Sequence, residues 1–389
     1  MKLILHIGTP RTDTKALQRW FATHRDGLTA RGVRYARAPG AENHRDLMLF
    51  ARDHDPADKS LRQFGITSPE THEAFRRKLA DGIAAEVAAN GDARVFVMSN
   101  EQIFSRITSP QTAGRLRDLL TPLFDEITVY LHLRPQVDLM MSNASQLARD
   151  GKQVTQAEFT RPGIGPNNFF YGYDRFVQIW EKVFGAGAIR LVPFRRDPDM
   201  TAVLIRDLGL TDAVADMTLP DGTDGDVTLD WRAMALANTV NRGLSDAGLP
   251  QMNYFLDTMT EIEPVQPGRA LAQDVQRRFD AANAALAVRR SDITHEDLTP
   301  DWSRYTPEGN LHLIEAPCVF PGQIAQVIHR YAQELALAKW QRAVSEGKLA
   351  ALQGDDRALQ QAQRQIAQAG DDLRRYGIVL ADGNPVAPA

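Results

Sequence analysis

The chain has 389 residues, of which 43% are hydrophobic and 24% are charged, and its formal net charge at pH 7 is −4. This composition is that of an ordinary globular protein, and the acidic excess excludes a general nucleic-acid-binding surface, which needs basic residues. No apolar run approaches the roughly 20 residues that span a bilayer, and the first eight residues are too short for a signal-peptide core. Because Cys318 is the single cysteine, no intrachain disulfide can form. We expect a cytoplasmic protein without a membrane span.

Short apolar runs alternate with helical patterns through the first half of the chain. Such alternation predicts parallel strands joined by crossover helices, so we expect an α/β fold with helices on both faces of a parallel sheet. The strands are expected at Leu3–Ile7, Val95–Met98, Ile127–Leu133 and Ile189–Phe194. The helices are expected at about 14–31, 69–89, 111–124, 135–149, 173–184 and 201–208.

A polar stretch rich in Pro, Gly and Asp at 219–228 predicts a boundary after this α/β part. Helical patterns return at about 229–247, 270–288 and 323–376. We therefore expect an α/β core over 1–218, a helical and irregular region over 219–322, C-terminal helices over 323–380 and a flexible tail over 381–389.

The most informative stretch follows the first predicted strand. Residues 6–18 read His-Ile-Gly-Thr-Pro-Arg-Thr-Asp-Thr-Lys-Ala-Leu-Gln. A strand that passes through such a turn into a helix directs backbone N–H groups and the positive helix end at one place, which predicts a phosphate or sulfate site. Arg11, Lys15 and Arg19 add positive charge there, and Thr12 and Thr14 add hydroxyl donors. The alternative is an ordinary strand–helix turn with exposed charges.

This stretch does not follow the Walker pattern of ATP-binding loops, because Asp13, Thr14 and Lys15 stand where that pattern needs Gly, Lys and Ser or Thr. It resembles the 5′-phosphosulfate loop of sulfotransferases, especially the bacterial pattern His-Ile-Gly-(Thr)-Pro-Lys-Thr-Gly-Thr-Thr-x-Leu-Gln. The resemblance implies a three-layer P-loop-like fold and a donor, 3′-phosphoadenosine 5′-phosphosulfate. The residues implied to hold the 5′-phosphosulfate are Arg11, Thr12, Asp13, Thr14 and Lys15.

Three of these residues depart from the family pattern. Arg11 replaces the lysine that stabilises charge on the leaving phosphate, Asp13 replaces a glycine, and Lys15 replaces a threonine. Arginine keeps the charge but presents a planar fork instead of a point charge. A catalytic role of Arg11 is therefore implied by the resemblance, while Asp13 places a carboxylate beside the expected anion.

A second possible anion site follows the third predicted strand. Arg134 ends that strand, and Ser142 lies eight residues later, about two helical turns along the next predicted helix. This spacing matches the 3′-phosphate site of sulfotransferases, so the resemblance implies that Arg134 and Ser142 bind the 3′-phosphate. Alternatively, Arg134 caps a sheet edge and Ser142 is a hydroxyl on a helix surface.

The second predicted strand runs into Ser99-Asn100-Glu101, at the edge of a parallel sheet where ligands bind. Carbohydrate sulfotransferases commonly place a glutamate here as general base, so we expect Glu101 to accept the proton of the acceptor hydroxyl. Equally, the Glu101 carboxylate could cap the start of the next helix. His44 and His132 are weaker candidates for the base.

The sequence thus predicts a sulfotransferase that needs no metal and acts on a carbohydrate or a small-molecule acceptor, with the helical second half shaping the acceptor pocket and the C-terminal helices available for homo-oligomer formation. Two alternatives remain. One is a catalytically impaired relative that binds the nucleotide or serves in assembly. The other is a small-molecule kinase, which would need ATP and magnesium.

Overall fold

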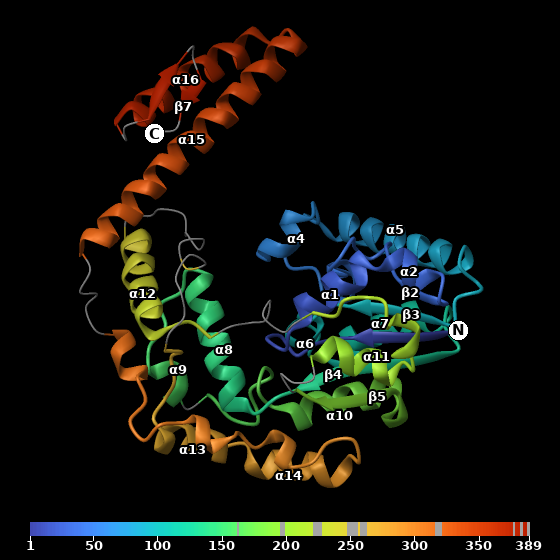
Figure 1. Cartoon of the computed structure of the whole chain (residues 1–389). Helices are drawn as coiled ribbons and strands as arrows, with labels where there is room; N and C mark the ends of the chain where they lie inside the picture. Colours follow the sequence, from blue (N-terminus) through green and yellow to red (C-terminus); the bar gives the residue numbers. More distant parts are fainter. Residues whose placement is uncertain are drawn as a thin grey trace. The chain divides into compact units, whose positions relative to one another are not determined.

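The computed structural model describes residues 1–161, 163–194, 199–220, 228–246, 256, 263–315, 321–375, 378–381 and 384–386. The chain divides into two compact units (Figure 1). Unit 1 consists of Met1–Ser145, Thr155–Leu229 and Val265–Leu311, and unit 2 of Gln146–Val154, Asp230–Pro264 and His312–Ala389.

Unit 1 is built on a five-stranded, all-parallel sheet with strand order β2-β3-β1-β4-β5. The strands are β1 (Lys2–His6), β2 (Val33–Tyr35), β3 (Val95–Ser99), β4 (Glu126–Leu133) and β5 (Ile189–Pro193). The chain reaches β2 and β3 on one side of β1 and then crosses to β4 and β5 on the other. Such a reversal of direction opens a crevice at the carboxyl ends of the central strands.

Both faces of the sheet are covered by helices, because alternate strand residues point to opposite faces and most of them are apolar. On one face, Ile4 and Val97 join a buried cluster with Phe21 of α1 (Thr14–Thr23) and Leu204 of α11 (Met200–Asp207). On the other face, Phe96 contacts Phe124 at a ring-centroid distance of 5.5 Å. The result is a helix–sheet–helix arrangement, visible in Figure 1.

Two of the covering helices begin at signals that are legible in the sequence. α5 (Pro69–Ala88) and α7 (Pro110–Leu120) each start with Ser-Pro, and Ser68 and Ser109 accept a hydrogen bond from the backbone N–H three residues on. These capping boxes satisfy backbone donors that a helix start leaves unpaired, and proline suits the first helical position. The remaining α-helices that begin in unit 1 are α2 (Arg25–Thr29), α3 (Arg45–Ala51), α4 (Lys59–Gln63), α6 (Gln102–Arg106), α8 (Gln136–Arg149), α9 (Ala157–Thr160), α10 (Tyr173–Phe184), α13 (Arg269–Arg277) and α14 (Asp280–Arg289).

Unit 2 is mostly helical. It contains α12 (Trp231–Asp246) and a hairpin of two long helices, α15 (Pro321–Gln353) and α16 (Asp356–Arg375). The hairpin encloses its own small core, in which Trp340 packs with Leu373 and neighbouring alanines. The antiparallel pair β6 (Val379–Ala381) and β7 (Asn384–Val386) follows.

The expected α/β fold with a helical C-terminal part is confirmed, and so are the four predicted strands. Strand β2 was not predicted, because it is only three residues long. Residues 265–311 group with the α/β unit and not with a separate middle region. Within the segment where a flexible tail was expected, residues 384–386 pair with 379–381. Part of the predicted boundary (221–227) and Cys318 lie outside the described residues.

None of the helices in the described part of the chain combines the length and apolarity that a bilayer crossing demands.

Candidate functional site

The loop between β1 and α1 lies at the carboxyl edge of the sheet, between the ends of β3 and β4. Its backbone continues the pairing with β4, since Thr9 N–H donates to the carbonyl of His132 at 3.0 Å. On the other side, a Cβ built on Gly8 would lie 3.1 Å from the Cα of Glu101. The backbone near Gly8 therefore approaches the end of β3 so closely that a side chain would not fit without a shift.

Three loop residues have a left-handed backbone: Gly8 (φ 98°), Arg11 (φ 69°) and Asp13 (φ 55°). Glycine adopts this conformation without a steric cost, and aspartate tolerates it better than most residues, whereas arginine does so rarely. Asp13 precedes α1 as its N-cap. The positive φ at Arg11 is a local cost that the contacts of its side chain and carbonyl have to offset.

Those contacts join Arg11 to the two residues that the sequence analysis placed at a second anion site. The Nε of Arg11 donates to the hydroxyl of Ser142 at 3.0 Å, and a terminal nitrogen of Arg134 donates to the carbonyl of Arg11 at 2.7 Å. Ser142 is fully buried, and Arg11 and Arg134 are 7% and 5% exposed. We call Arg11, Arg134 and Ser142 the cationic centre. It brings two guanidinium groups to one loop, a favourable arrangement for an anion.

Threonine hydroxyls surround the same loop. Thr12 donates to the carbonyl of Thr9 at 2.7 Å and so closes the turn. Thr9 and Thr14 are almost completely buried, and their hydroxyl oxygens have no hydrogen-bond partner among the residues that the structure describes. Buried hydroxyls normally have a partner, so these two are candidates to bind a ligand. Lys15, in contrast, is exposed on α1.

A second group of polar side chains, at the ends of β1 and β3, surrounds Glu101. The side-chain nitrogen of Gln18 donates to Oε2 of Glu101 at 3.0 Å, and that of Asn43 donates to the same oxygen at 3.1 Å. Asn43 also donates to Oε1 at 3.4 Å. We call Gln18, Asn43 and Glu101 the carboxylate centre. Glu101 is the N-cap of α6 without a side-chain capping bond, so this carboxylate binds amides and not the helix start.

The histidines near this edge are buried and neutral. Burial lowers the pKa of both His44 and His132 to about 3. The ring of His44 is engaged on both sides, because Nδ1 accepts from Ser99 N–H at 2.8 Å and Nε2 lies 2.9 Å from the carbonyl of Ala36. A base with so low a pKa and no spare nitrogen is poorly suited to take a proton near neutral pH. Among the candidates, the geometry favours Glu101 over His44.

A cavity of about 660 Å³ opens beside Arg134. Phe194 forms one wall, and the guanidinium of Arg134 lies 4.9 Å from the centre of its ring. Two of the residues that line the cavity are basic, Arg134 and Arg304. Four are acidic: Asp138, Glu296, Asp297 and Asp301. An anion entering this cavity is therefore attracted at the Arg134 end and repelled by the segment 296–301.

Comparisons with known proteins give one result. No protein-family model and no curated protein matches the sequence. Among solved structures, the chain is similar to a sulfotransferase from Alicyclobacillus acidocaldarius, with 15% sequence identity and a TM-score of 0.35. The match covers 65% of this chain and 98% of that protein. It is a distant structural resemblance that assigns no activity.

The structure brings the predicted residues together in part. Arg11, Arg134 and Ser142 are in contact, and Glu101 lies against the same loop. Lys15 is exposed. The sequence analysis missed Asn43, since an asparagine in an irregular segment carries no periodic or motif signal. Among the described residues, no group of His, Cys, Asp and Glu side chains is arranged to hold a metal ion.

Proposed function

We propose that the chain is a sulfotransferase that moves a sulfuryl group from 3′-phosphoadenosine 5′-phosphosulfate to a hydroxyl of a carbohydrate or small molecule. The observation that carries the proposal is the loop between β1 and α1, which is tied to Arg134 and Ser142 by the hydrogen bonds of the cationic centre. A strand–loop–helix with left-handed residues and two guanidinium groups is a chemically suitable site for a phosphate or sulfate ester.

The residues present fit such a donor. The buried hydroxyls of Thr9 and Thr14 lack a partner among the described residues and can donate to the oxygens of an anion. Arg134 and Ser142 are where the sulfotransferase resemblance expects the 3′-phosphate. Because four carboxylates line the cavity beside Arg134, a second phosphate is favoured only close to the cationic centre.

When bound, the donor supplies an activated sulfuryl group attached to a phosphate leaving group. In the proposed mechanism, Arg11 holds the leaving phosphate and stabilises the charge that develops on it. Glu101 would accept the proton of the acceptor hydroxyl as the hydroxyl oxygen bonds to sulfur and the bond between sulfur and the leaving phosphate breaks. The close approach of Gly8 to Glu101 supports this assignment, because it places the base next to the anion loop.

The decisive experiment measures sulfuryl transfer from the donor to a panel of glycans and small alcohols, together with the affinity of 3′,5′-adenosine bisphosphate. We expect Arg11→Ala to lose at least about a hundredfold in turnover, the scale seen when one preorganised charge donor is removed. Arg11→Lys should keep or raise activity, because a lysine keeps the positive charge and presents the compact ammonium group that the family loop carries at this position.

A matched control is Arg117→Ala, which removes an exposed arginine paired with Asp118 on the surface of α7. It should behave as the wild type. Nucleotide binding without transfer in the wild type would overturn the enzyme assignment in favour of a binding or assembly protein. Binding of ATP with magnesium in preference to the adenosine bisphosphate would support a kinase.

A further inference from the structure

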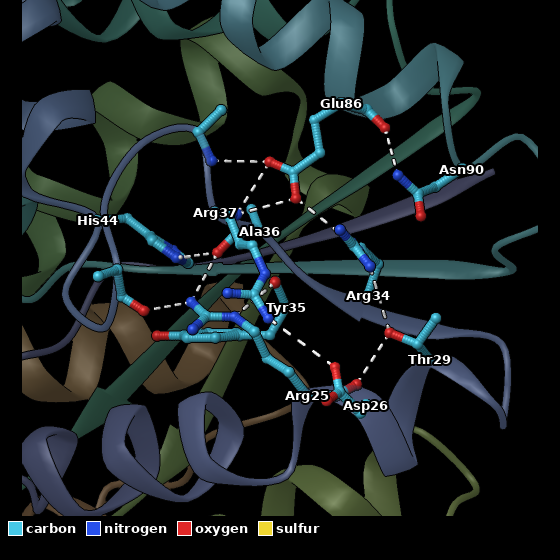
Figure 2. A network of polar contacts seen from close by, with 12 residues as sticks. Arg25, Asp26, Thr29, Arg34, Tyr35, Ala36, Arg37, His44, Glu86 and Asn90 are labelled. Carbon is cyan, nitrogen blue, oxygen red and sulfur yellow. Dashed lines mark hydrogen bonds and ion pairs between the residues drawn. The ribbon is translucent and has the colours of Figure 1, made fainter.

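The segment 36–44, which connects β2 to α3, is anchored by a buried arginine. Arg25 of α2 donates to the carbonyls of Tyr35 at 3.1 Å and Ala36 at 3.0 Å, and it also contacts the carbonyl of Ala41. Its guanidinium lies 5.0 Å from the centre of the Tyr35 ring. Figure 2 shows Arg25 stacked along this ring beneath the segment. A planar group with several donors can hold several carbonyls at once.

Two further anchors act on the same segment, and Figure 2 shows the one that Glu86 makes. The carboxylate of Glu86 on α5 accepts from the backbone N–H groups of Arg37 at 2.9 Å and Ala38 at 2.7 Å. His44 ties the end of the segment to β3 through Ser99 N–H. At Gly40, where φ is 144°, an added Cβ would lie 2.3 Å from the carbonyl oxygen of Asn43. The segment is therefore held in one tight conformation.

This conformation places the side chain of Asn43 at the sheet edge. Its Nδ2 meets Glu101, while its Oδ1 accepts from Asn100. Chemistry fixes this orientation, because a carboxylate oxygen can only accept and the amide must turn its nitrogen to it. For the same reason, the side-chain amide of Gln18 must turn its nitrogen to the carboxylate.

The two carboxylate oxygens are held unequally. Oε2 of Glu101 accepts from Gln18 at 3.0 Å and from Asn43 at 3.1 Å, whereas the 3.4 Å contact with Asn43 is the only one that Oε1 makes with the described residues. We propose that Asn43 is a positioning residue that, together with Gln18, holds Oε2 and leaves Oε1 of Glu101 to take the acceptor proton. The proposal rests on the proposed sulfotransferase function and names the residue that orients its base.

The buried histidines near the carboxylate centre stay neutral near neutral pH. Burial lowers the pKa of His44 to about 3 and that of His6 well below its usual value. Burial also raises the pKa of Tyr35, the last residue of β2, so this hydroxyl stays protonated as well. The signal of the Glu101 carboxyl itself can be followed apart from these histidines, which makes a direct test possible.

The test combines kinetics with a titration that does not depend on activity. Sulfuryl transfer is measured for the wild type, Asn43→Ala and Asn43→Asp, and the Glu101 carboxyl is followed by NMR in protein with labelled glutamate, assigned with Glu101→Gln. We expect Asn43→Ala to lower kcat about tenfold with KM and donor affinity within about twofold. The titration midpoint of Glu101 should rise by about one pH unit, since a donor to the charged form is lost.

Asn43→Asp keeps the shape of the side chain but places a second carboxylate beside Glu101. It should move the acid limb of the pH–rate profile further upward than Asn43→Ala does. The control Asn90→Asp makes the same change at a residue whose side chain donates to the carbonyl of Glu86, and should leave both readouts unchanged.

An unchanged Glu101 midpoint in both Asn43 variants would overturn the positioning role even if the wild type transfers sulfate. A shifted midpoint without any transfer by the wild type would overturn the proposed function and the base role with it, while the contact between Asn43 and Glu101 would stand. The two failures are therefore distinguishable.

Discussion

The cationic centre and the carboxylate centre lie on the two sides of the same loop, and they are held in opposite ways. In the cationic centre the charged groups act as the donors: Arg134 donates to the backbone of Arg11, and Arg11 donates to a serine. In the carboxylate centre the charged group is the acceptor, and neutral amides orient it. Guanidinium groups stay charged at every relevant pH, whereas a carboxylate can gain and lose a proton.

This difference separates two roles that a transfer enzyme needs. A permanently charged centre suits the binding of an anion and the stabilisation of a leaving group, because it does not change state during the reaction. A carboxylate held by amides suits proton transfer, because the amides fix its direction without adding a second titrating charge. Changes at the first centre should therefore appear in nucleotide affinity and turnover, and changes at the second in turnover and pH dependence.

The largest expected effect comes from the carboxylate centre. Glu101→Gln should lower turnover by roughly 10²–10⁴-fold, the usual contribution of general-base catalysis, with nucleotide affinity and thermal stability nearly unchanged. Sulfuryl-transfer kinetics and calorimetric binding of 3′,5′-adenosine bisphosphate measure the two quantities. Glu126→Gln, at an exposed glutamate that pairs with Lys2, is the matched control and should resemble the wild type. A fully active Glu101→Gln would assign the proton to water or to another residue and would erase the functional contrast between the centres.

Much of the fold was predictable because its signals are local and repeated. The apolar runs of β1, β3, β4 and β5 are bounded by helical patterns, and Ser-Pro starts mark α5 and α7. The edge strand β2 was missed because three residues carry no periodicity. The pairing of β7 with β6 was also missed, because each of these strands is only three residues long.

The candidate site, too, was predictable only in part. Arg11, Arg134, Ser142 and Glu101 could be named from the sequence because charged residues at strand ends stand out and their spacing fits a known pattern. The hydrogen bond of Arg11 to Ser142 could not, since it joins residues far apart in the chain. Asn43 could not either, because its role depends on how Arg25, Glu86 and His44 fix an irregular segment.

A smaller effect tests the cationic centre. Arg134→Ala should weaken binding of 3′,5′-adenosine bisphosphate about tenfold or more, the usual contribution of a charge-assisted hydrogen bond, and weaken adenosine 5′-phosphosulfate much less. Comparing the two nucleotides is necessary because Arg134 also holds the carbonyl of Arg11, so part of any loss could come from the loop. Equal weakening of the binding of both nucleotides would show that Arg134 supports the loop and does not bind the 3′-phosphate.

The last expected effect is on local stability and not on binding or turnover, and it concerns pH, to which the two centres should respond differently. Burial lowers the pKa of His44 from 6.5 in the unfolded chain to about 3 in the folded protein. The unfolded chain therefore binds a proton that the folded protein does not, so the contribution of His44 to stability is complete above pH 6.5 and is lost as the pH falls toward 3. The segment 36–44 and β3, which His44 joins, should loosen on acidification, while the guanidinium contacts of the cationic centre should not.

Hydrogen exchange at matched pH values tests this, with the β3 peptide that contains Ser99 as the readout, since Ser99 N–H donates to His44. In the wild type, the free energy of local opening should fall by up to about 1.4 kcal/mol per pH unit between pH 6 and 4 because of this one group. His44→Gln should be less protected at pH 7, because it loses ring contacts, yet it should lack this part of the slope, so that the two proteins converge at low pH. His295→Gln, at an exposed histidine, should follow the wild type throughout. Parallel pH profiles for wild type and His44→Gln would mean that His44 does not couple protonation to this edge of the sheet, and the contrast in pH sensitivity between the two centres would have to come from Glu101 alone.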